Sequence, residues 1–375
     1  MKLTTAGESH GKGLYGILTD VPSNLAVDIQ EIDAELALRQ SGYGRGGRQK
    51  IEKDHVQILS GVRNGKTLGS PVCFCVENRD YANWQPYMDA EACDVSKKTL
   101  TRVRPGHADL TGMIKYDHDD ARNVLERASA RETAARVVGG SICKQFLAAF
   151  GVQIAARVVS VAGVKDEGEY TFSQIAAAKD SPLFMLDKEA ESRAMQAIDA
   201  CKADGDTAGG VIEIRVAGMK KGFGSCMEYD RKLDGLLAGA VMSVQAIKGV
   251  EFGMGFDCAA HKGSEVHDEI FAENGKIVRK TNRAGGIEGG MSNGEEIVIR
   301  AAMKPIPTLM RGLQTVDYAT GEAALSAPER SDVTAVPACA VVLEAAVAVC
   351  LSQVVGKRLG GDHMGEMVER WNALR

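Results

Sequence analysis

Aromatic residues, proline and net positive charge are all scarce in this sequence. Aromatic residues make up 5% of the 375 residues, proline occurs nine times, and the formal net charge is −5. This acidic balance argues against a protein that binds nucleic acid through a basic surface. Proteins that bind single-stranded RNA stack its bases on aromatic side chains. The Arg- and Gly-rich segments described below contain one aromatic residue, Tyr43. We therefore expect no nucleic-acid partner.

Cysteine motifs with organised spacing are also missing. The nine cysteines are scattered and include no CxxC pair, whereas zinc sites and disulfide frameworks both need regular spacing. Cys73 and Cys75 lie two apart in a predicted strand, where cysteine behaves as a small hydrophobic residue. We expect reduced, buried thiols and no metal site. His118, at the acid-rich start of a helix, is interpreted as structural.

No segment has the composition expected of a targeting or membrane-spanning element. The first residues lack an apolar stretch, so no secretory signal is expected. The most apolar run, 333–355, contains Pro337, Glu344, Ser352 and Gln353, which is typical of a buried core helix rather than a membrane span. These features predict a cytoplasmic protein without a membrane partner.

Hydrophobic periodicity predicts a mixture of helices and strands. Helices are expected over 28–40, 119–150, 187–203, 231–247 and 337–356, and strands over 152–164, 210–216 and 296–302. A hairpin is expected over 56–76, with its turn at Asn64-Gly65. The longest helix has its weak point at Gly139-Gly140. Irregular alternation and short turns favour a largely antiparallel α+β fold over a doubly wound parallel sheet.

Glycine is abundant, with 42 residues or about 11% of the chain, against an average of roughly 7%. The run GYGRGG at 42–47 matches a dinucleotide fingerprint in its letters. That fingerprint must follow a strand and open a helix, whereas this run follows a predicted helix and precedes a hairpin. The run GVRNGKT at 61–67 is one residue short of a phosphate-binding loop and lies inside the hairpin. Neither run is interpreted as a nucleotide site.

Arginine, histidine and serine recur beside glycine or other small residues in several separate segments. The residues concerned are Ser9, His10, Arg39, Arg45, Arg48, Arg104, His107, Arg127, Ser129, Arg131, Lys304, Arg330 and Asp332. Arginine in such loops can clamp a phosphate or carboxylate with two hydrogen bonds. Several such loops in an acidic chain indicate a local basic pocket for a small, highly anionic ligand. These residues alone point to an enzyme acting on a phosphorylated polyanion, with histidine acids and an aspartate base.

Eight segments in order give the chain a specific family resemblance. They are AGESHG, GYGRGGRQKIEKD, RPGHAD, RASARETAARV, AIKGVEFGMGF, NRAGGIEGGMSNGE, KPIPTL and ERSDVTAVP, and they extend from residue 6 to residue 337. Together they resemble the conserved blocks of the chorismate synthase family. Two departures are Arg330-Ser331-Asp332, where members often read RHDP, and Gln49, where methionine is common.

The resemblance implies a fold, an activity and a cofactor. The family fold has helices sandwiched between antiparallel sheets, and we expect a single such domain over 1–375 that assembles as a homotetramer. The implied reaction is a 1,4-anti elimination of phosphate from 5-enolpyruvylshikimate 3-phosphate, which gives chorismate without net redox change and requires reduced FMN. It belongs to the shikimate pathway of aromatic amino acid biosynthesis. NADP is associated with the family. No separate reductase domain is expected, so an external flavin reductase would supply reduced FMN.

The resemblance also assigns roles to individual residues. By this resemblance His10 would act as general acid at the leaving phosphate, His107 would stabilise charge at the flavin, and Asp332 with Ser9 would help to move a flavin proton. Substrate would be held by Arg39, Arg45, Arg48, Arg104 and Arg131. The flavin would be surrounded by Arg127, Ala128, Ser129, Gln245, Ala246, Gly289, Lys304, Pro305, Ile306, Pro307, Thr308 and Arg330. No metal site is implied.

Two alternatives to this assignment remain open from the sequence. One is another flavin-dependent lyase or isomerase that acts on a phosphorylated carboxylate. The other is a non-enzymatic protein that binds phosphorylated ligands or RNA loops through the same arginines. Turnover of the shikimate-pathway substrate with reduced FMN would separate all three.

Overall fold

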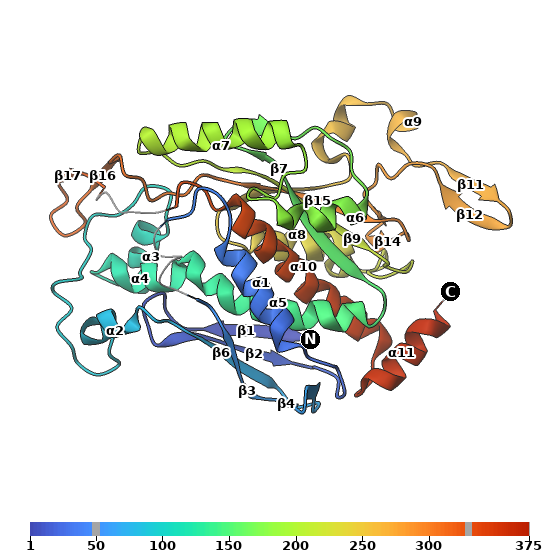
Figure 1. Cartoon of the computed structure of the whole chain (residues 1–375), viewed down its shortest axis with the longest axis horizontal. Coiled ribbons are helices and arrows are strands. Elements are labelled where there is room, and N and C mark those ends of the chain that lie inside the picture. Colours follow the sequence, from blue (N-terminus) through green and yellow to red (C-terminus); the bar gives the residue numbers. More distant parts are fainter. Residues whose placement is uncertain (47–52, 327–331, 375) are drawn as a thin grey trace.

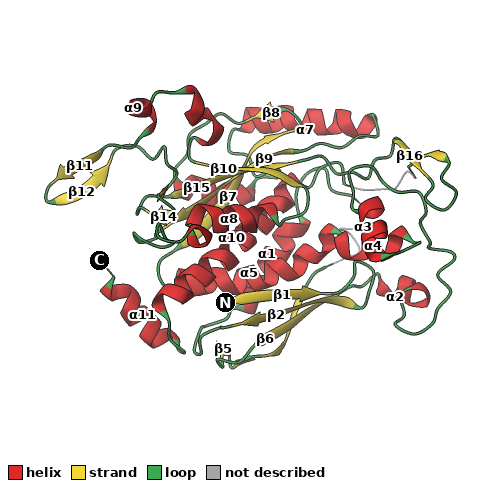
Figure 2. Cartoon of the chain, turned by 180° about the vertical axis from the view of Figure 1, so that it is seen from behind, coloured by secondary structure: helices red, strands yellow, loops and turns green. Residues whose placement is uncertain are grey.

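The computed structural model describes residues 1–46, 53–326 and 332–374. Two antiparallel sheets form its outer layers, and helices lie between them (Figures 1 and 2). The first sheet has the order β1 (Lys2–Ala6), β2 (Gly13–Thr19), β6 (Val72–Glu77) and β3 (Val56–Ser60). The second has the order β10 (Ile247–Phe252), β15 (Ile297–Met303), β9 (Gly210–Ala217), β7 (Gln153–Val161) and β8 (Val164–Lys165). The predicted helix sandwich is confirmed.

The helical layer between the sheets is built mainly from α1 (Ile29–Gln40), α5 (Thr133–Ala148) and α10 (Val336–Leu359), and α8 (Leu233–Met242) packs against α10 and β10. Outside this layer lie α2 (Tyr81–Trp84), α3 (Asp109–Tyr116), α4 (Ala121–Ala128), α6 (Phe172–Ala176), α7 (Lys188–Ala203), α9 (Gly263–Val266) and α11 (Met364–Ala373). Small antiparallel ribbons pair β4 (Val62–Arg63) with β5 (Lys66–Thr67), β11 (Ile270–Glu273) with β12 (Lys276–Arg279), β13 (Ile287–Glu288) with β14 (Met291–Ser292), and β16 (Gln314–Val316) with β17 (Ala323–Leu325). The main apolar core includes residues from Met1 to Trp371, and a second, small cluster of Val103, Met113, Ala121 and Val124 lies at α3 and α4.

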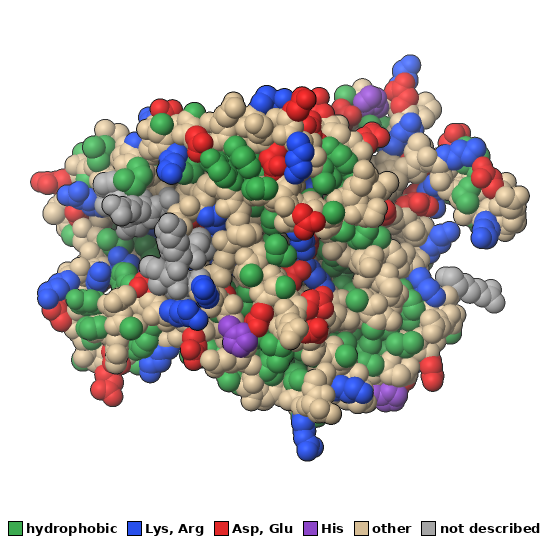
Figure 3. Space-filling view, in the orientation of Figure 1, with side chains coloured by type: hydrophobic (Ala, Val, Ile, Leu, Met, Phe, Trp, Pro, Cys, Tyr) green, Lys and Arg blue, Asp and Glu red, His purple; other side chains and the backbone are tan. Residues whose placement is uncertain are grey.

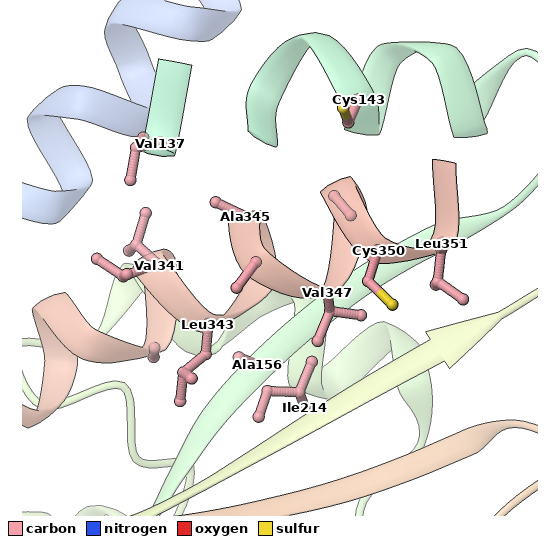
Figure 4. Packing of buried hydrophobic residues seen from close by; sticks show 14 of the residues in the cluster. Val137, Cys143, Ala156, Ile214, Val341, Leu343, Ala345, Val347, Cys350 and Leu351 are labelled. Atoms are coloured by element: carbon pink, nitrogen blue, oxygen red, sulfur yellow. The ribbon is translucent and has the colours of Figure 1, made fainter. Parts of the chain in front are cut away.

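Helix α10 is the central element of this core. It is the one helix in the described ranges long and apolar enough to cross a membrane by length and composition, and 83% of its apolar window is buried inside the protein. In Figure 4, Val341 and Ala345 point from α10 towards α5, while Leu343 and Val347 point towards the sheet that carries Ile214. The helix therefore buries opposite faces against two different layers, as expected of a core helix hydrophobic on all sides.

The expected helix over 119–150 is wrong as a single helix. The chain forms α4, a 3₁₀ turn at Ala130–Glu132 and then α5, because Ser129 adopts an extended conformation with ψ of 140°. The Ser129 hydroxyl accepts a hydrogen bond from the backbone N–H of Arg131 at 3.2 Å, which begins the next turn. The break thus lies ten residues before Gly139-Gly140. The helix α5 continues through these two glycines without interruption.

Gly140 allows α5 and α10 to cross at close range. A Cβ atom placed at Gly140 would lie 2.3 Å from the Cβ of Ala345 and 2.5 Å from its Cα. Because the obstacle includes backbone, a neighbouring side chain cannot relieve it by changing rotamer. The glycine pair is therefore a packing feature rather than a point where the helix breaks.

We predict that Gly140→Ala lowers the free energy of unfolding by at least about 3 kcal/mol, the upper end for overpacking a core. Urea unfolding at fixed protein concentration measures the effect. Gly239→Ala in α8 is the matched control, since no heavy atom lies within 4 Å of its added Cβ. The control is expected to gain up to about 1 kcal/mol from helix propensity. Equal stability of Gly140→Ala and the parent would contradict the close crossing.

Several smaller expectations can be compared with the fold. The turn at Asn64-Gly65 is confirmed, with both residues at positive φ, and it closes the β4–β5 ribbon. The segment 42–46 follows α1 rather than a strand, which excludes the dinucleotide fingerprint. The helix expected over 231–247 ends earlier, at Met242, and Ala246 has a φ of +71° just before β10.

The cysteines are unpaired, and their burial differs from the expectation in part. Cys75, Cys143, Cys339 and Cys350 are buried, Cys73, Cys93 and Cys201 are partly buried, and Cys226 and Cys258 are exposed. Burial raises the pKa of the Cys339 and Cys350 thiols to about 12. Within the described residues, no cluster of three His, Cys, Asp or Glu side chains could hold a metal ion.

Candidate active site

A cavity of about 890 Å³ lies where the C-terminal end of α1, the break between α4 and α5, and the N-terminal end of α10 meet. Its described wall includes the cationic side chains of Arg39, Arg45, Arg104, Arg122, Arg131 and Lys304. His10 and His107 also line it. Among the described wall residues, Asp332 is the one carboxylate. The cavity is therefore strongly basic within an acidic protein.

The face of the protein seen in Figure 3 does not share this charge pattern. Figure 3 shows acidic and basic side chains interspersed across one face of the molecule. The positive charge is concentrated inside the cavity, where arginines from distant parts of the chain converge. Such a concentration attracts small anions and is the arrangement expected for a polyanionic ligand.

Arg39 and Arg131, both on the cavity wall, share one buried carboxylate that lies behind it. Asp54 receives two hydrogen bonds from Nη1 of Arg131, at 2.8 and 2.7 Å, and lies 3.7 Å from Nη1 of Arg39. Burial and the positive charge of Arg131 lower the pKa of Arg39 to about 9, and Asp54 opposes this shift. Both guanidinium groups also line the cavity, where they can meet an anion.

Arg45 reaches the cavity from the loop after α1. Its Nη1 lies 2.7 Å from Oδ2 of Asp332, and Oδ1 of Asp332 accepts a hydrogen bond from the backbone of Gly46 at 2.5 Å. Burial lowers the pKa of Arg45, and the charge of Asp332 opposes this. The pair joins the segment before α10 to the loop after α1, although 286 residues separate Gly46 from Asp332.

His107 belongs to a compact group with Arg104 and Asp109. Nδ1 of His107 lies 2.5 Å from Oδ1 of Asp109, and Nε and Nη2 of Arg104 donate to the same carboxylate at 2.8 and 3.0 Å. Burial alone would raise the pKa of Asp109, but hydrogen bonds from His107 and Arg104 and their charges hold it well below its usual range. Asp109 therefore stays ionised and fixes both side chains.

His10 is held in a similar way by a different carboxylate. Its Nδ1 lies 2.8 Å from Oε1 of Glu126 in α4. Ser9, beside it, accepts a hydrogen bond from the Ser129 hydroxyl at 3.2 Å. The two histidines thus come from separate loops, and each is oriented by a buried acid through Nδ1.

Another part of the wall is formed by the segments expected from the sequence to surround a flavin. Gln245 and Ala246, between α8 and β10, lie beside Lys304, Ile306, Pro307 and Thr308, which follow β15. Lys304 donates through Nζ to the carbonyl of Gly106, and Arg104 donates to the Thr308 hydroxyl at 3.2 Å. These contacts connect the flavin segments directly to the His107 loop.

The structure places most residues singled out from the sequence on the cavity wall, but not all. Those on the wall are Ser9, His10, Arg39, Arg45, Arg104, His107, Ala128, Ser129, Arg131, Gln245, Ala246, Lys304, Ile306, Pro307, Thr308 and Asp332. Pro305 and Gly289 are not part of the described wall, and Gly289 lies in the β13–β14 turn. Arg127 is also outside it, since its guanidinium donates to Thr5 and Gly7. Arg48 and Arg330 lie outside the described residues.

Four residues of this region were missed by sequence reasoning. Trp84 and Arg122 line the cavity, and Glu126 and Asp54 bind its wall residues from behind. Arg122 and Glu126 stand just before the recognised RASARE segment and are four residues apart, the spacing of an ion pair on one helix face, which is a signal that could have found them. Asp54 is the last residue of the recognised segment GYGRGGRQKIEKD, so that segment was a signal for it. Trp84 stands in an ordinary-looking polar segment and carried no such signal.

The chain is similar to known chorismate synthases along nearly its whole length. The chorismate synthase family model matches residues 1–355. The chorismate synthase of Alkaliphilus metalliredigens is 53% identical over 374 residues, which cover 99% of this chain and 98% of that protein. That of Geobacter sulfurreducens is 52% identical over 380 residues, with coverages of 98% and 96%. A crystal structure of chorismate synthase matches with a TM-score of 0.80 and 41% identity, over 99% of this chain and 96% of that chain.

Proposed function

The chain belongs to the chorismate synthase family, and on that premise we propose that its cavity eliminates phosphate from 5-enolpyruvylshikimate 3-phosphate beside a bound, reduced FMN. Members of this family are lyases, so the chain is an enzyme of that class. The observation that carries the proposal is the convergence of six described cationic side chains and two histidines on one cavity. The substrate carries two carboxylates and a phosphate, and FMN brings another phosphate, so the charges are complementary.

The cavity has room and chemistry for a flavin as well as a substrate. Its volume of about 890 Å³ lies near the upper end of the roughly 300–1,000 Å³ typical of ligand sites. Two buried polar atoms on its wall, Oε1 of Gln245 and Nε of Arg45, have no hydrogen-bond partner in the described part of the chain. A flavin ring offers both N–H donors and carbonyl acceptors, which such atoms require. Gln245, Ala246, Ala128, Ser129 and the segment 304–308 would hold it.

The difficult part of the reaction is breaking an allylic C–O bond while removing a weakly acidic ring proton. Reduced flavin supplies transient electron density for this step, and the protein orients and tunes the reactants. His10 donates a proton from Nε2 to the departing phosphate. Arg39, Arg45, Arg104 and Arg131 bind the anionic groups and stabilise the charge that develops on the phosphate.

The remaining wall residues handle charge and protons on the flavin side. His107 stabilises negative charge there, with its orientation set by Asp109. With FMN bound, Asp332, relayed by Ser9, would assist removal of the proton at flavin N5, so that the flavin could serve as the base that takes the ring proton of the substrate. Arg45 is the fixed partner of Asp332, with its Nη1 2.7 Å from Oδ2, and it holds that carboxylate in place at the cavity wall.

We further propose that the chain acts as one domain over 1–375, as a homotetramer in the cytoplasm, with NADP-linked reduction of FMN carried out by a separate flavin reductase. The main apolar core, which includes residues from Met1 to Trp371, supports a single domain. The loop over 42–46 and the turn at Asn64-Gly65 lack the strand-to-helix setting of a second nucleotide site.

The proposed function predicts turnover in an anaerobic assay with reduced FMN and 5-enolpyruvylshikimate 3-phosphate. Chorismate absorbance and released phosphate should rise in equal amounts. Oxidised FMN with NADPH, but without an added reductase, is expected to give no product. Absence of product with reduced FMN, combined with binding of a different phosphorylated acid, would instead support another flavin-dependent lyase or isomerase.

A further inference from the structure

Glu126 holds His10 by two groups at once. Oε1 of Glu126 lies 2.8 Å from Nδ1 of the ring, and Oε2 accepts a hydrogen bond from the backbone N–H of His10, also at 2.8 Å. The Glu126 side chain is only 4% exposed. A carboxylate that binds both the ring and the backbone of one residue fixes the torsions between them. The position of the imidazole is therefore set by α4, 116 residues further along the chain.

Trp84 holds the plane of the same imidazole ring. The rings of His10 and Trp84 are stacked, with centroids 4.0 Å apart and planes inclined by 27°. The Arg122 guanidinium lies 4.9 Å from the Trp84 ring centroid, and its Nη1 is 3.3 Å from Oε1 of Glu126. His10, Glu126, Trp84 and Arg122 therefore form one contiguous group at the cavity wall.

This arrangement determines which ring nitrogen of His10 can serve a ligand. With Nδ1 donating to Glu126, Nε2 is the nitrogen left for the cavity, and the ring has no other hydrogen-bond partner in the described ranges. Burial would raise the pKa of Glu126, but hydrogen bonds and charge from His10, with a further contribution from Arg122, lower it. Glu126 is thus ionised and supplies a counter-charge for a protonated imidazole.

We propose that Glu126 is a positioning residue for the reaction: it fixes His10 with Nδ1 as donor and stabilises the protonated ring whose Nε2 faces the leaving phosphate. This inference rests on the proposed role of His10. Glu126 reaches the reacting atoms only through the imidazole, because it is not part of the described cavity wall. The same logic places an oriented carboxylate behind the histidine in other acid–base sites.

The experiment is a double-mutant cycle that combines Glu126→Gln with His10→Ala, assayed anaerobically with reduced FMN. Glu126→Gln is expected to lower kcat by about 10–100-fold and to leave KM within about twofold, because Glu126 does not touch the substrate. In the His10→Ala background, the same substitution is expected to change kcat by less than about twofold, since residues that act as a unit are not additive.

Glu213→Gln is the matched control for loss of a buried, arginine-paired carboxylate. Glu213 lies in β9, away from the described cavity wall, with its Oε1 3.2 Å from Nε of Arg157. Its kcat should stay within about twofold of the parent. If Glu126→Gln does not fold, as judged by thermal unfolding, Glu126→Asp enters the same cycle. The shorter side chain keeps the charge but cannot reach both the ring and the backbone, so the same losses are expected.

Each outcome of the cycle decides the inference. An unchanged kcat in the Glu126 variant, or an equal loss in both backgrounds, would overturn it, because a purely structural role predicts additivity. If His10→Ala lowers kcat while Glu126→Gln keeps the kcat of the parent, this inference is overturned and the proposed function still stands. Normal turnover by His10→Ala would remove the assigned role of His10 and this inference together.

Discussion

His10→Ala is expected to lower kcat by about 10–10³-fold while the protein stays folded, the range for loss of a general acid. The departing phosphate then lacks its proton donor, and a tenfold loss corresponds to about 1.4 kcal/mol of barrier. Folding should survive because Glu126 keeps two partners, Arg122 at 3.3 Å and the backbone N–H of residue 10. Steady-state assays with reduced FMN, together with thermal unfolding, measure both quantities.

His55→Ala is the matched control for His10→Ala. His55 also pairs its Nδ1 with a carboxylate, Asp33 at 2.5 Å, but its side chain is 65% exposed and stands apart from the described cavity wall. Its kcat should equal that of the parent. Near-normal turnover by folded His10→Ala would show that protonation of the phosphate does not depend on this side chain.

His107→Ala is expected to reduce kcat by a similar factor of about 10–10³. His107 stands between the cavity and Asp109, whose side chain is 1% exposed, so its ring is rigidly oriented towards the proposed flavin. Its loss removes a group that stabilises negative charge on the flavin side. Asp109 keeps its two hydrogen bonds from the Arg104 guanidinium, so no unpaired buried charge is created and folding should persist.

His118→Ala tests whether the effect at His107 is specific to the cavity. His118 is partly buried just after α3 and does not line the described wall of the cavity. We expect its kcat to match the parent. If His107→Ala also matches the parent in kcat, with the flavin bound, the role assigned to this histidine is wrong.

The basic cavity explains how an acidic protein can bind a polyanion. The formal net charge is −5, yet six described cationic side chains line the cavity, and Asp332 is the one carboxylate among its described wall residues. Buried arginine retains its charge because its ordinary pKa is so high: even at about 9, Arg39 is protonated at neutral pH. The net charge is a sum over the whole chain. It therefore gives no information about the charge inside the cavity, which depends on the side chains that line it.

The sequence by itself determined the family and the class of fold, and it singled out many of the residues that line the cavity. The eight ordered segments include His10, Arg45, His107, Arg131 and other residues that meet in the cavity. This was possible because their chemistry requires particular side chains beside small residues, which leaves a local pattern in the chain. Short-range turn chemistry, as at Asn64-Gly65, was equally readable, since it depends on neighbouring residues alone.

Only the tertiary structure decided which acid stands behind each base and where the longest helical pattern breaks. Glu126 is 116 residues from His10 and Asp54 is 77 from Arg131, so no local periodicity links them. Gly139-Gly140 looked like the weak point of a helix, but it is the place where α10 crosses, and the break falls at Ser129 instead. Arg127 has a favourable motif, yet it bonds to Thr5 and Gly7. Such contacts depend on how separate elements pack, and packing is a property of the whole fold.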